Sequence, residues 1–209
     1  MACVTFVDDL LGSVLDALEG SSFANNTIVI FTSDHGYHLG EKDQLFKHTL
    51  WDESTRIPYI FKVPGMTKPG TECGQPVSLI DMYPTLADLC NLEGITMKSE
   101  QGAPLDGYSL RGLLENPSAG DWDGPEVALS AIISDRVKEG NNIPMNAEDQ
   151  HFSVRSVQWR YSLAYDGTEE LYDHASDPNE WKNLVGDTNY REVKSGLKEG
   201  LLDLTGRFK

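Results

Sequence analysis

The spacing of hydrophobic residues in the first half of the chain predicts helices alternating with strands. Residues 27–32 are apolar or β-branched throughout, which favours a strand buried on both faces, as in a parallel sheet covered by helices. A second strand is expected at residues 57–63, and a helix containing Pro84 at residues 77–89. Helical spacing over residues 4–19 predicts an amphipathic helix that packs one stripe against a sheet (Val4, Val7, Leu11, Val14, Leu15 and Leu18).

The pattern changes after about residue 120. Residues 120–125 are typical of a linker, and the polar stretches 91–107 and 137–150 are typical of loops. Short β-rich runs then predict a small antiparallel sheet, with Asp166-Gly167 as a hairpin turn and a closing helix at residues 188–204 (runs 127–133, 152–158, 159–165 and 170–172). We therefore expect two parts, residues 1–120 with an α/β arrangement and residues 121–209 with the antiparallel sheet.

Composition narrows the classes of partner. The net charge of −16 and the pI near 4.5 argue against nucleic acid and anionic membrane surfaces as partners. Cys3, Cys73 and Cys90 are an odd number without a close pair, so no disulfide framework or zinc cluster is predicted. The sequence has no apolar run of membrane-spanning length and does not start with a signal peptide.

Polar residues follow the first predicted strand directly, as Ser33-Asp34-His35-Gly36. In α/β sheets the chemistry gathers where strands end at their carboxyl edge. Asp34 and His35 could ligate a metal ion there, and Lys47-His48 could bring an ammonium group and a second imidazole to the same edge. A purely structural alternative is that Asp34 caps the following turn and His35 is an ordinary loop histidine.

The longer string containing these residues resembles a known family. Residues 33–42 (SDHGYHLGEK) and 47–58 (KHTLWDESTRIP) closely resemble the sulfatases of the alkaline-phosphatase-like superfamily, in the branch of iduronate-2-sulfatase and its bacterial relatives. Residues 170–184 resemble the C-terminal signature of that family. The resemblance implies an α/β fold, namely the C-terminal portion of an alkaline-phosphatase-like sheet sandwiched by helices, followed by a small antiparallel α+β subdomain.

The resemblance also implies roles for individual residues. Asp34 and His35 would bind Ca²⁺, with Mg²⁺ as the alternative, and Lys47 would contact the sulfate group and act in catalysis. His38 and His48 are further candidates for binding substrate. Among the other residues, we expect an ion pair between Glu53 and Arg56, surface or turn positions for His151 and His174, and core positions for Trp159 and Trp181.

The nucleophile of the family is missing from this sequence. Family members convert the cysteine of Cys-x-Pro-Ser-Arg or Cys-x-Ala-x-Arg into formylglycine, and none of the three cysteines lies in such a string. The family's N-terminal Asp-Asp metal pair is also missing, because Asp8-Asp9 lies within a predicted helix. We therefore expect the chain to be the C-terminal part of a sulfatase, inactive alone, whose complete protein is periplasmic or secreted.

The expected activity of the complete protein is hydrolysis of sulfate monoesters on a small molecule or, more specifically, a carbohydrate. A phosphodiester or phosphonate monoester hydrolase of the same superfamily is the alternative enzyme. A non-catalytic binding fragment that keeps the fold without the nucleophile is the alternative from another class.

Overall fold

The computed structural model describes residues 2–92, 105–118, 122–133 and 147–206. The chain divides into two compact units, one formed by residues 1–32 and 58–72 and the other by residues 33–57 and 73–209. The predicted loops at 91–107 and 137–150 and the linker at 120–125 lie largely or partly outside the described residues. Within the described part of the chain, no helix is both long enough and apolar enough to cross a membrane.

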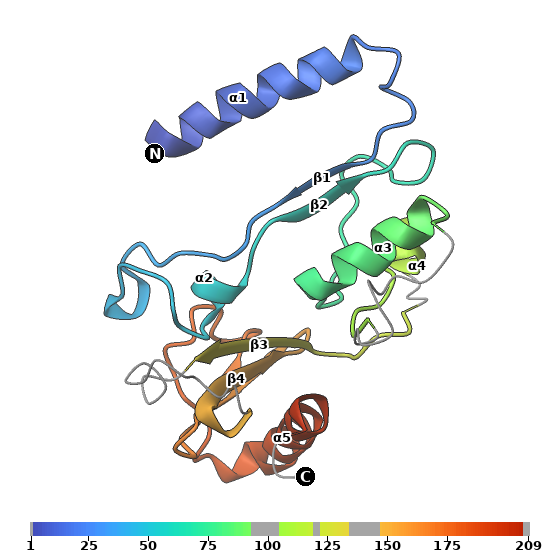
Figure 1. The fold of residues 1–209 in the computed structure, drawn as a ribbon. Helices are drawn as coiled ribbons and strands as arrows, with labels where there is room; N and C mark the ends of the chain where they lie inside the picture. Colours follow the sequence, from blue (N-terminus) through green and yellow to red (C-terminus); the bar gives the residue numbers. More distant parts are fainter. Residues whose placement is uncertain (1, 93–104, 119–121, 134–146, 207–209) are drawn as a thin grey trace, which may run out of the picture. The chain divides into compact units, whose positions relative to one another are not determined.

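The first unit contains one long helix and two strands (Figure 1). Helix α1 spans Ala2–Glu19, and strands β1 (Val29–Thr32) and β2 (Tyr59–Lys62) pair antiparallel, with Val29 opposite Lys62. The expectation that the first strand is buried on both faces is wrong for this structure, because among the described residues β1 pairs only with β2 and Phe31 is 38% exposed. Helix α1 forms as predicted, but none of its residues is buried.

The second unit contains the predicted antiparallel sheet. Strands β3 (Ala128–Ile133), β4 (Gln150–Arg155), β5 (Trp159–Leu163) and β6 (Glu169–Asp173) pair in chain order. The turn between β5 and β6 contains Gly167 at a φ of 88°, a left-handed conformation that glycine adopts without steric cost. The hairpin predicted at Asp166-Gly167 is therefore confirmed.

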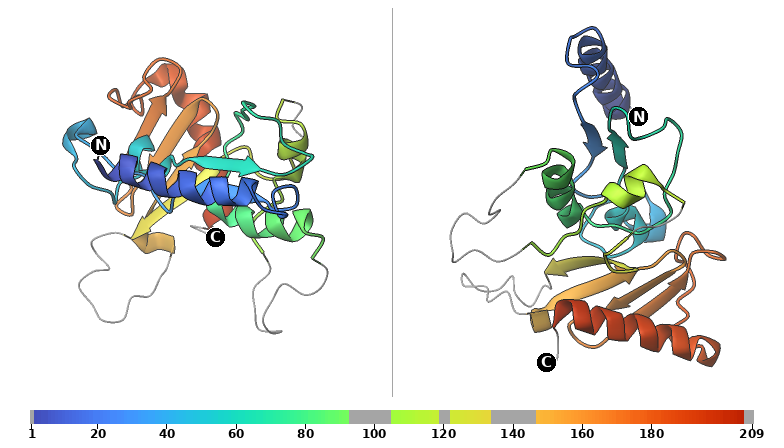
Figure 2. Two further views of the ribbon diagram at one scale, coloured as in Figure 1. Left: turned by 90° about the horizontal axis from the view of Figure 1, so that it is seen from above. Right: turned by 90° about the vertical axis from the view of Figure 1, so that its right-hand side faces the viewer.

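Helix α5 (Arg191–Thr205) packs along this sheet, and the main hydrophobic core lies between the helix and the sheet (Figure 2). The amphipathic pattern of α5 places Leu201 in the core. The short helix η5 (Thr188–Tyr190) precedes α5, and at its start the Asp187 side chain accepts a hydrogen bond from the Asn189 amide. The core consists of seven buried side chains from strands β4 to β6, from helix α5 and, for Leu184, from the loop between β6 and η5: Phe152, Val154, Tyr161, Leu163, Leu171, Leu184 and Leu201. Trp159 packs against it as expected, whereas Trp181 is 63% exposed, contrary to expectation.

Short helices complete the second unit: η1 (Glu41–Asp43), α2 (Asp52–Thr55), η2 (Leu79–Asp81), α3 (Met82–Leu89), α4 (Arg111–Glu115) and η4 (Ala147–Asp149). Pro84 lies in the first turn of α3, where a proline does not remove a helical hydrogen bond, so the helix continues past it. The buried Asp81 carboxylate accepts hydrogen bonds from the backbone amides of Ser78 and Tyr108.

Candidate active site

The segment of residues 33–57 folds back on itself through two backbone contacts. The Gly36 amide donates to the Ser54 carbonyl (2.9 Å), and the His38 amide donates to the Phe46 carbonyl (2.9 Å). A Cβ atom on Gly36 would lie 1.9 Å from the carbonyl oxygen of Glu53, closer than any side chain permits. Glycine at position 36 is therefore required for the start of this segment to approach helix α2.

Asp34, His35 and Lys47 come together in this segment, as the sequence predicted. The Lys47 ammonium group lies 2.6 Å from Nε2 of His35, and the Asp34 carboxylate lies 3.5 Å from the same nitrogen. Nδ1 of His35 lies 2.8 Å from the Gly36 carbonyl oxygen. Because a carbonyl can only accept, Nδ1 donates to it, and because an ammonium group can only donate, the lone pair of Nε2 accepts from Lys47.

This arrangement fits two ligands of a metal ion. A backbone carbonyl that fixes the tautomer of a ligating histidine is a common feature of metal sites. Nε2 of His35 and the Asp34 carboxylate lie 3.5 Å apart, and the Lys47 ammonium group, 2.6 Å from Nε2, supplies positive charge beside them. Asp34 is exposed and His35 is about one-third exposed, so both remain accessible to an ion. The metal and catalytic assignments of these three residues stay predictions.

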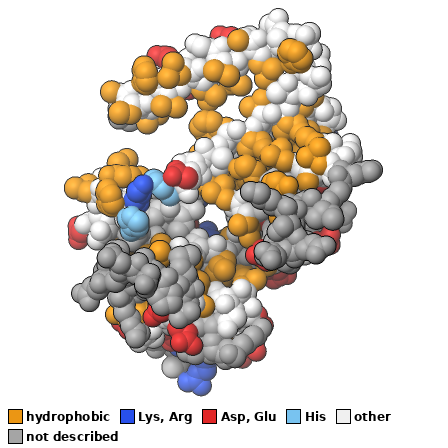
Figure 3. Space-filling view, viewed as in Figure 1, with side chains coloured by type: hydrophobic (Ala, Val, Ile, Leu, Met, Phe, Trp, Pro, Cys, Tyr) orange, Lys and Arg blue, Asp and Glu red, His pale blue; other side chains and the backbone are white. Residues whose placement is uncertain are grey.

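The two other predicted substrate-binding residues lie in different surroundings. His38 is fully buried, and its Nε2 lies 2.8 Å from the Thr49 hydroxyl, while Nδ1 has no hydrogen-bond partner among the described residues. His48 is exposed and stacks on Phe46, with ring centroids 6.0 Å apart. In Figure 3, histidine and lysine side chains lie beside exposed hydrophobic ones. A substrate contact would need the buried His38 to move, so of the two only His48 is accessible as it stands.

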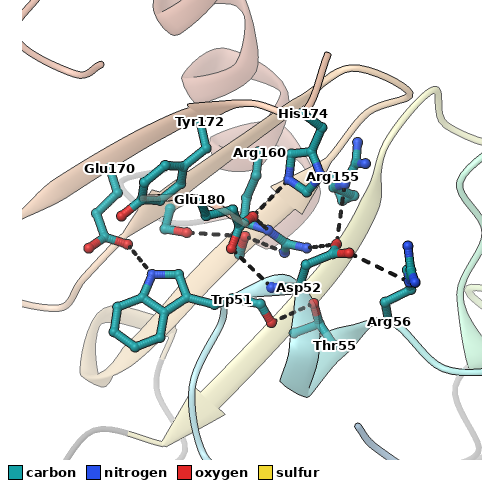
Figure 4. A network of polar contacts seen from close by, with 12 residues as sticks. Trp51, Asp52, Thr55, Arg56, Arg155, Arg160, Glu170, Tyr172, His174 and Glu180 are labelled. Carbon is teal, nitrogen blue, oxygen red and sulfur yellow. Dashed lines mark hydrogen bonds and ion pairs between the residues drawn. The ribbon is translucent and has the colours of Figure 1, made fainter. Parts of the chain in front are cut away.

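A buried polar network joins this segment, through Asp52, to Arg160 and Glu180, and it was not predicted from the sequence (Figure 4). The Arg160 guanidinium group is almost completely buried and forms ion pairs with the carboxylates of Asp52 (2.6 Å) and Glu180 (2.5 Å). Nε2 of His174 lies 2.8 Å from Glu180, and Arg155 lies 3.5 Å from Asp52. Burial raises the pKa of Glu180, but the hydrogen bond from His174 and the charge of Arg160 outweigh it and lower that pKa below its usual value.

The network could be mistaken for a metal centre. Asp52, His174 and Glu180 place three possible ligand atoms within 4.8 Å of one another. The guanidinium group of Arg160 bonds to both carboxylates, however, and supplies the positive charge that a metal would supply. Asp52 and Glu180 are therefore better described as partners of Arg160, and His174 as a partner of Glu180. Asp34 and His35 form the more accessible pair of possible ligands.

Two expectations about neighbouring residues are wrong. Arg56 pairs with Asp52 (3.6 Å), one helical turn away, and not with Glu53. His151 lies half-buried in strand β4 and not at the surface or in a turn. His174 lies in a turn as expected, although its side chain is only 9% exposed and contacts Glu180. A sequence signal for the network exists in hindsight: Arg160 interrupts an otherwise buried strand, and a charge at such a position requires a buried partner.

Comparison with known proteins gives a consistent result. Residues 1–92 match the family model named Sulfatase. Over 198 residues the chain is 35% identical to a protein named Sulfatase from Formosa agariphila, covering 95% of this chain and 34% of that protein. It is 30% identical to an ulvan-active sulfatase of the same organism, covering all of this chain and 39% of that protein. The chain thus spans little more than a third of the length of these relatives.

Solved structures show the same likeness. The structure of BT4656 in complex with its substrate D-glucosamine-2-N,6-O-disulfate matches with a TM-score of 0.81 and 25% identity, covering 99% of this chain and 40% of that chain. A phosphonate monoester hydrolase of Agrobacterium radiobacter matches with a TM-score of 0.73 and 27% identity, covering 96% of this chain and 39% of that chain.

Proposed function

Because this chain is a relative of the sulfatases and has the fold of the alkaline-phosphatase-like superfamily, we propose that it is the C-terminal part of an enzyme that hydrolyses sulfate monoesters. The observation that carries the proposal is the convergence of Asp34, His35 and Lys47 in the second unit. Two ligand groups and one ammonium group are what a site for a dianionic or monoanionic ester needs. The formylglycine nucleophile would come from residues outside this sequence.

Asp34 and His35 would hold a divalent cation, Ca²⁺ or alternatively Mg²⁺. Carboxylate oxygen suits both ions, and calcium takes about six to eight ligands, so other groups would complete its coordination. When bound, such a cation supplies positive charge against the oxygens of the ester. The contact between Nδ1 of His35 and the Gly36 carbonyl leaves Nε2 as the acceptor nitrogen of the ring, and a cation bound there would take the place of the Lys47 contact.

Lys47 would stabilise the transition state. As the S–O bond of the ester breaks, negative charge builds on the departing oxygen and on the sulfate oxygens, and a fixed ammonium group offsets it. The protein as a whole carries a net charge of −16, which repels an anionic substrate at long range. Local positive charge from Lys47 and a cation would therefore be necessary for the substrate to bind.

We propose a sulfated carbohydrate as the substrate class. The proposal is supported by the structural likeness to BT4656, which was solved with a disulfated glucosamine, and by the ulvan-active relative. The exposed ring of His48, stacked on Phe46, is an accessible group in this segment that could contact a sugar.

The test is a kinetic comparison in the full-length protein that contains these residues, with an activated aryl sulfate as the substrate. Lys47→Ala should lower kcat by on the order of 10²–10³, as expected for the loss of one preorganised charge donor. Lys68→Ala, an exposed lysine of the first unit, is the control and should leave kcat unchanged. A Lys47→Ala variant with a raised KM and an unchanged kcat would contradict the catalytic role.

Two further measurements bear on the metal and the nucleophile. Calcium should raise the melting temperature of the wild type but not of Asp34→Ala, because a ligand that binds only the native state stabilises it. Equal stabilisation of both proteins would contradict the ligand assignment.

The 209-residue chain alone should release no phenol from the aryl sulfate, since none of its cysteines lies in the string that is converted to formylglycine.

A phosphonate monoester hydrolase is the second candidate function, favoured by the match to the Agrobacterium radiobacter enzyme. Both reactions need a cation and an ammonium group against an anionic ester, so the residues described here serve either one. The ratio of kcat/KM for an aryl sulfate to that for the corresponding phosphonate monoester decides between them. A ratio below one would favour the phosphonate.

A further inference from the structure

The stretch that carries Lys47, residues 42–52, is attached at both of its ends to the same residue. At its start, the Lys42 ammonium group hydrogen-bonds to the backbone carbonyl of Glu180 and lies 3.4 Å from the Tyr172 hydroxyl. The same ammonium group lies 4.5 Å from the ring centroids of Trp51 and of Tyr172. A cation against two aromatic faces is held more firmly than one at an exposed site.

At the other end of the stretch, the Asp52 amide donates to the Glu180 carboxylate (3.0 Å). The Asp52 side chain pairs with Arg160, which pairs in turn with Glu180 (Figure 4). Trp51 adds a hydrogen bond from its indole nitrogen to Glu170 (3.1 Å). The backbone carbonyl of Glu180 thus holds one end of the stretch, and its side chain holds the other.

Glu180 is itself fixed from several sides. It is fully buried, and one carboxylate oxygen accepts from both Arg160 (2.5 Å) and His174 (2.8 Å), while the other accepts from the Asp52 amide. Its backbone has a φ of 56°, a conformation that is uncommon for residues other than glycine. A buried carboxylate with three charged or polar donors is stable as an anion, which suits it to hold its neighbours in fixed positions.

The stretch between the two attachments has an unfavourable backbone conformation. Lys42, Asp43 and His48 have φ values of 53°, 58° and 71°. Conformations of this kind are unfavourable for residues other than glycine and persist only where surrounding contacts enforce them. Between the attachments, the side chains of Leu45 and Phe46 are exposed, and two contacts with His38 hold the stretch: the His38 amide donates to the Phe46 carbonyl, and the His38 ring contacts the Thr49 hydroxyl. The attachments at Lys42 and Asp52 fix the two ends of the stretch and act together with these contacts to keep Lys47 beside His35.

We propose that Glu180 is a positioning residue that orders residues 42–52 and thereby places the Lys47 ammonium group at the active site. The proposal rests on the proposed function for the role of Lys47, but the ordering of the stretch can be measured without any activity. Glu180 does not touch Lys47; it acts through Lys42 and Asp52.

The experiment compares Glu180→Gln, Lys42→Met and Glu169→Gln by hydrogen–deuterium exchange of the full-length protein. Glu180→Gln places an amide donor among groups that all donate, and Lys42→Met removes the ammonium group while keeping a long side chain. Both should make amides of residues 42–52 exchange roughly 10- to 100-fold faster, while strands β4 to β6 stay protected. Lys42→Met lies outside the buried network and so keeps the test valid if Glu180→Gln fails to fold.

Glu169→Gln is the matched control, because Glu169 also pairs with cations but contacts Lys194 and Lys198 of α5. It should leave exchange of residues 42–52 at the wild-type rate. Wild-type exchange in that stretch for Glu180→Gln and Lys42→Met would overturn the proposal, as would faster exchange in Glu169→Gln.

A double-mutant cycle tests whether the ordering acts through Lys47. Glu180→Gln should lower kcat for the aryl sulfate about tenfold in the wild type but less than about threefold in the Lys47→Ala background, because coupled residues are not additive. Equal losses in both backgrounds would overturn the link to Lys47. A wild type without sulfatase turnover would contradict the proposed function, whereas the exchange comparison would still decide whether Glu180 orders the stretch.

Discussion

The two units of this structure bury their apolar side chains to very different extents. In the four-stranded sheet with α5, Val154, Tyr161 and Leu171 are completely buried. In the first unit, Val4 and Val14 of α1 are 69% and 65% exposed although they lie on the predicted apolar stripe. In both regions the spacing of hydrophobic residues matches the helix or strand that forms. That spacing therefore predicts the type of element, whereas the burial of its side chains depends on how many other elements pack against it.

Replacing a leucine in each region should show this difference most strongly. Leu171→Ala removes a fully buried side chain from the centre of the core and should lower the free energy of unfolding by about 2–5 kcal/mol. Leu10→Ala, at a position in α1 that is 53% exposed, should change it by no more than about 0.5 kcal/mol. Urea unfolding monitored by circular dichroism measures both values, and equal losses would contradict the contrast.

Acid should weaken the four-stranded sheet through Glu169. Burial raises the pKa of this carboxyl, but hydrogen bonds from Lys198 and Tyr161 and the charges of Lys198 and Lys194 lower it to about 2. Because the pKa is lower in the folded protein, ionised Glu169 stabilises the fold above its usual pKa of 4.5, and this stabilisation is lost as the pH falls toward about 2. Melting temperatures between pH 6 and 2 should decline less steeply in Glu169→Gln than in the wild type, and identical profiles would refute the assignment.

The smallest effect is expected for the ion pair of the first unit. Lys62 and Glu19 lie 3.4 Å apart, and their side chains are 53% and 67% exposed. Exposed pairs of this kind contribute about 0–1 kcal/mol, because water and salt screen the charges. Lys62→Met should therefore shift the urea midpoint only slightly, and a loss as large as that of Leu171→Ala would show that the first unit is more tightly packed than the structure indicates.

Local patterns in the sequence predicted most of the elements. The hairpin at Asp166-Gly167 and the closing helix were predictable because turn chemistry and helical periodicity are properties of neighbouring residues. Asp34, His35 and Lys47 were singled out because they follow a strand and match a family string. Their convergence in the structure agrees with that reasoning, although their roles are still to be measured.

The Arg160 network could not be predicted in the same way. Its members come from α2, β5 and the turn after β6, and no local pattern reports which distant residues meet. The exposure of Trp181 was missed for a related reason: an aromatic residue near a core sequence is apolar enough to be buried, but here it lies in an exposed part of the loop after β6. Such pairings depend on tertiary structure and not on sequence spacing.

The attachments of the Lys47 stretch also have a consequence for the order of folding. Lys42 and Glu180 are separated by 138 residues, and Asp52 and Arg160 by 108. Contacts across such long separations form late, because a long chain segment must first be closed. During synthesis Lys47 leaves the ribosome well before Glu180, and domains fold from the N-terminus onward. The stretch therefore gains its final shape only after β6 and the following turn have been made, and a nascent chain that stops before residue 180 would carry Lys47 on an unanchored loop.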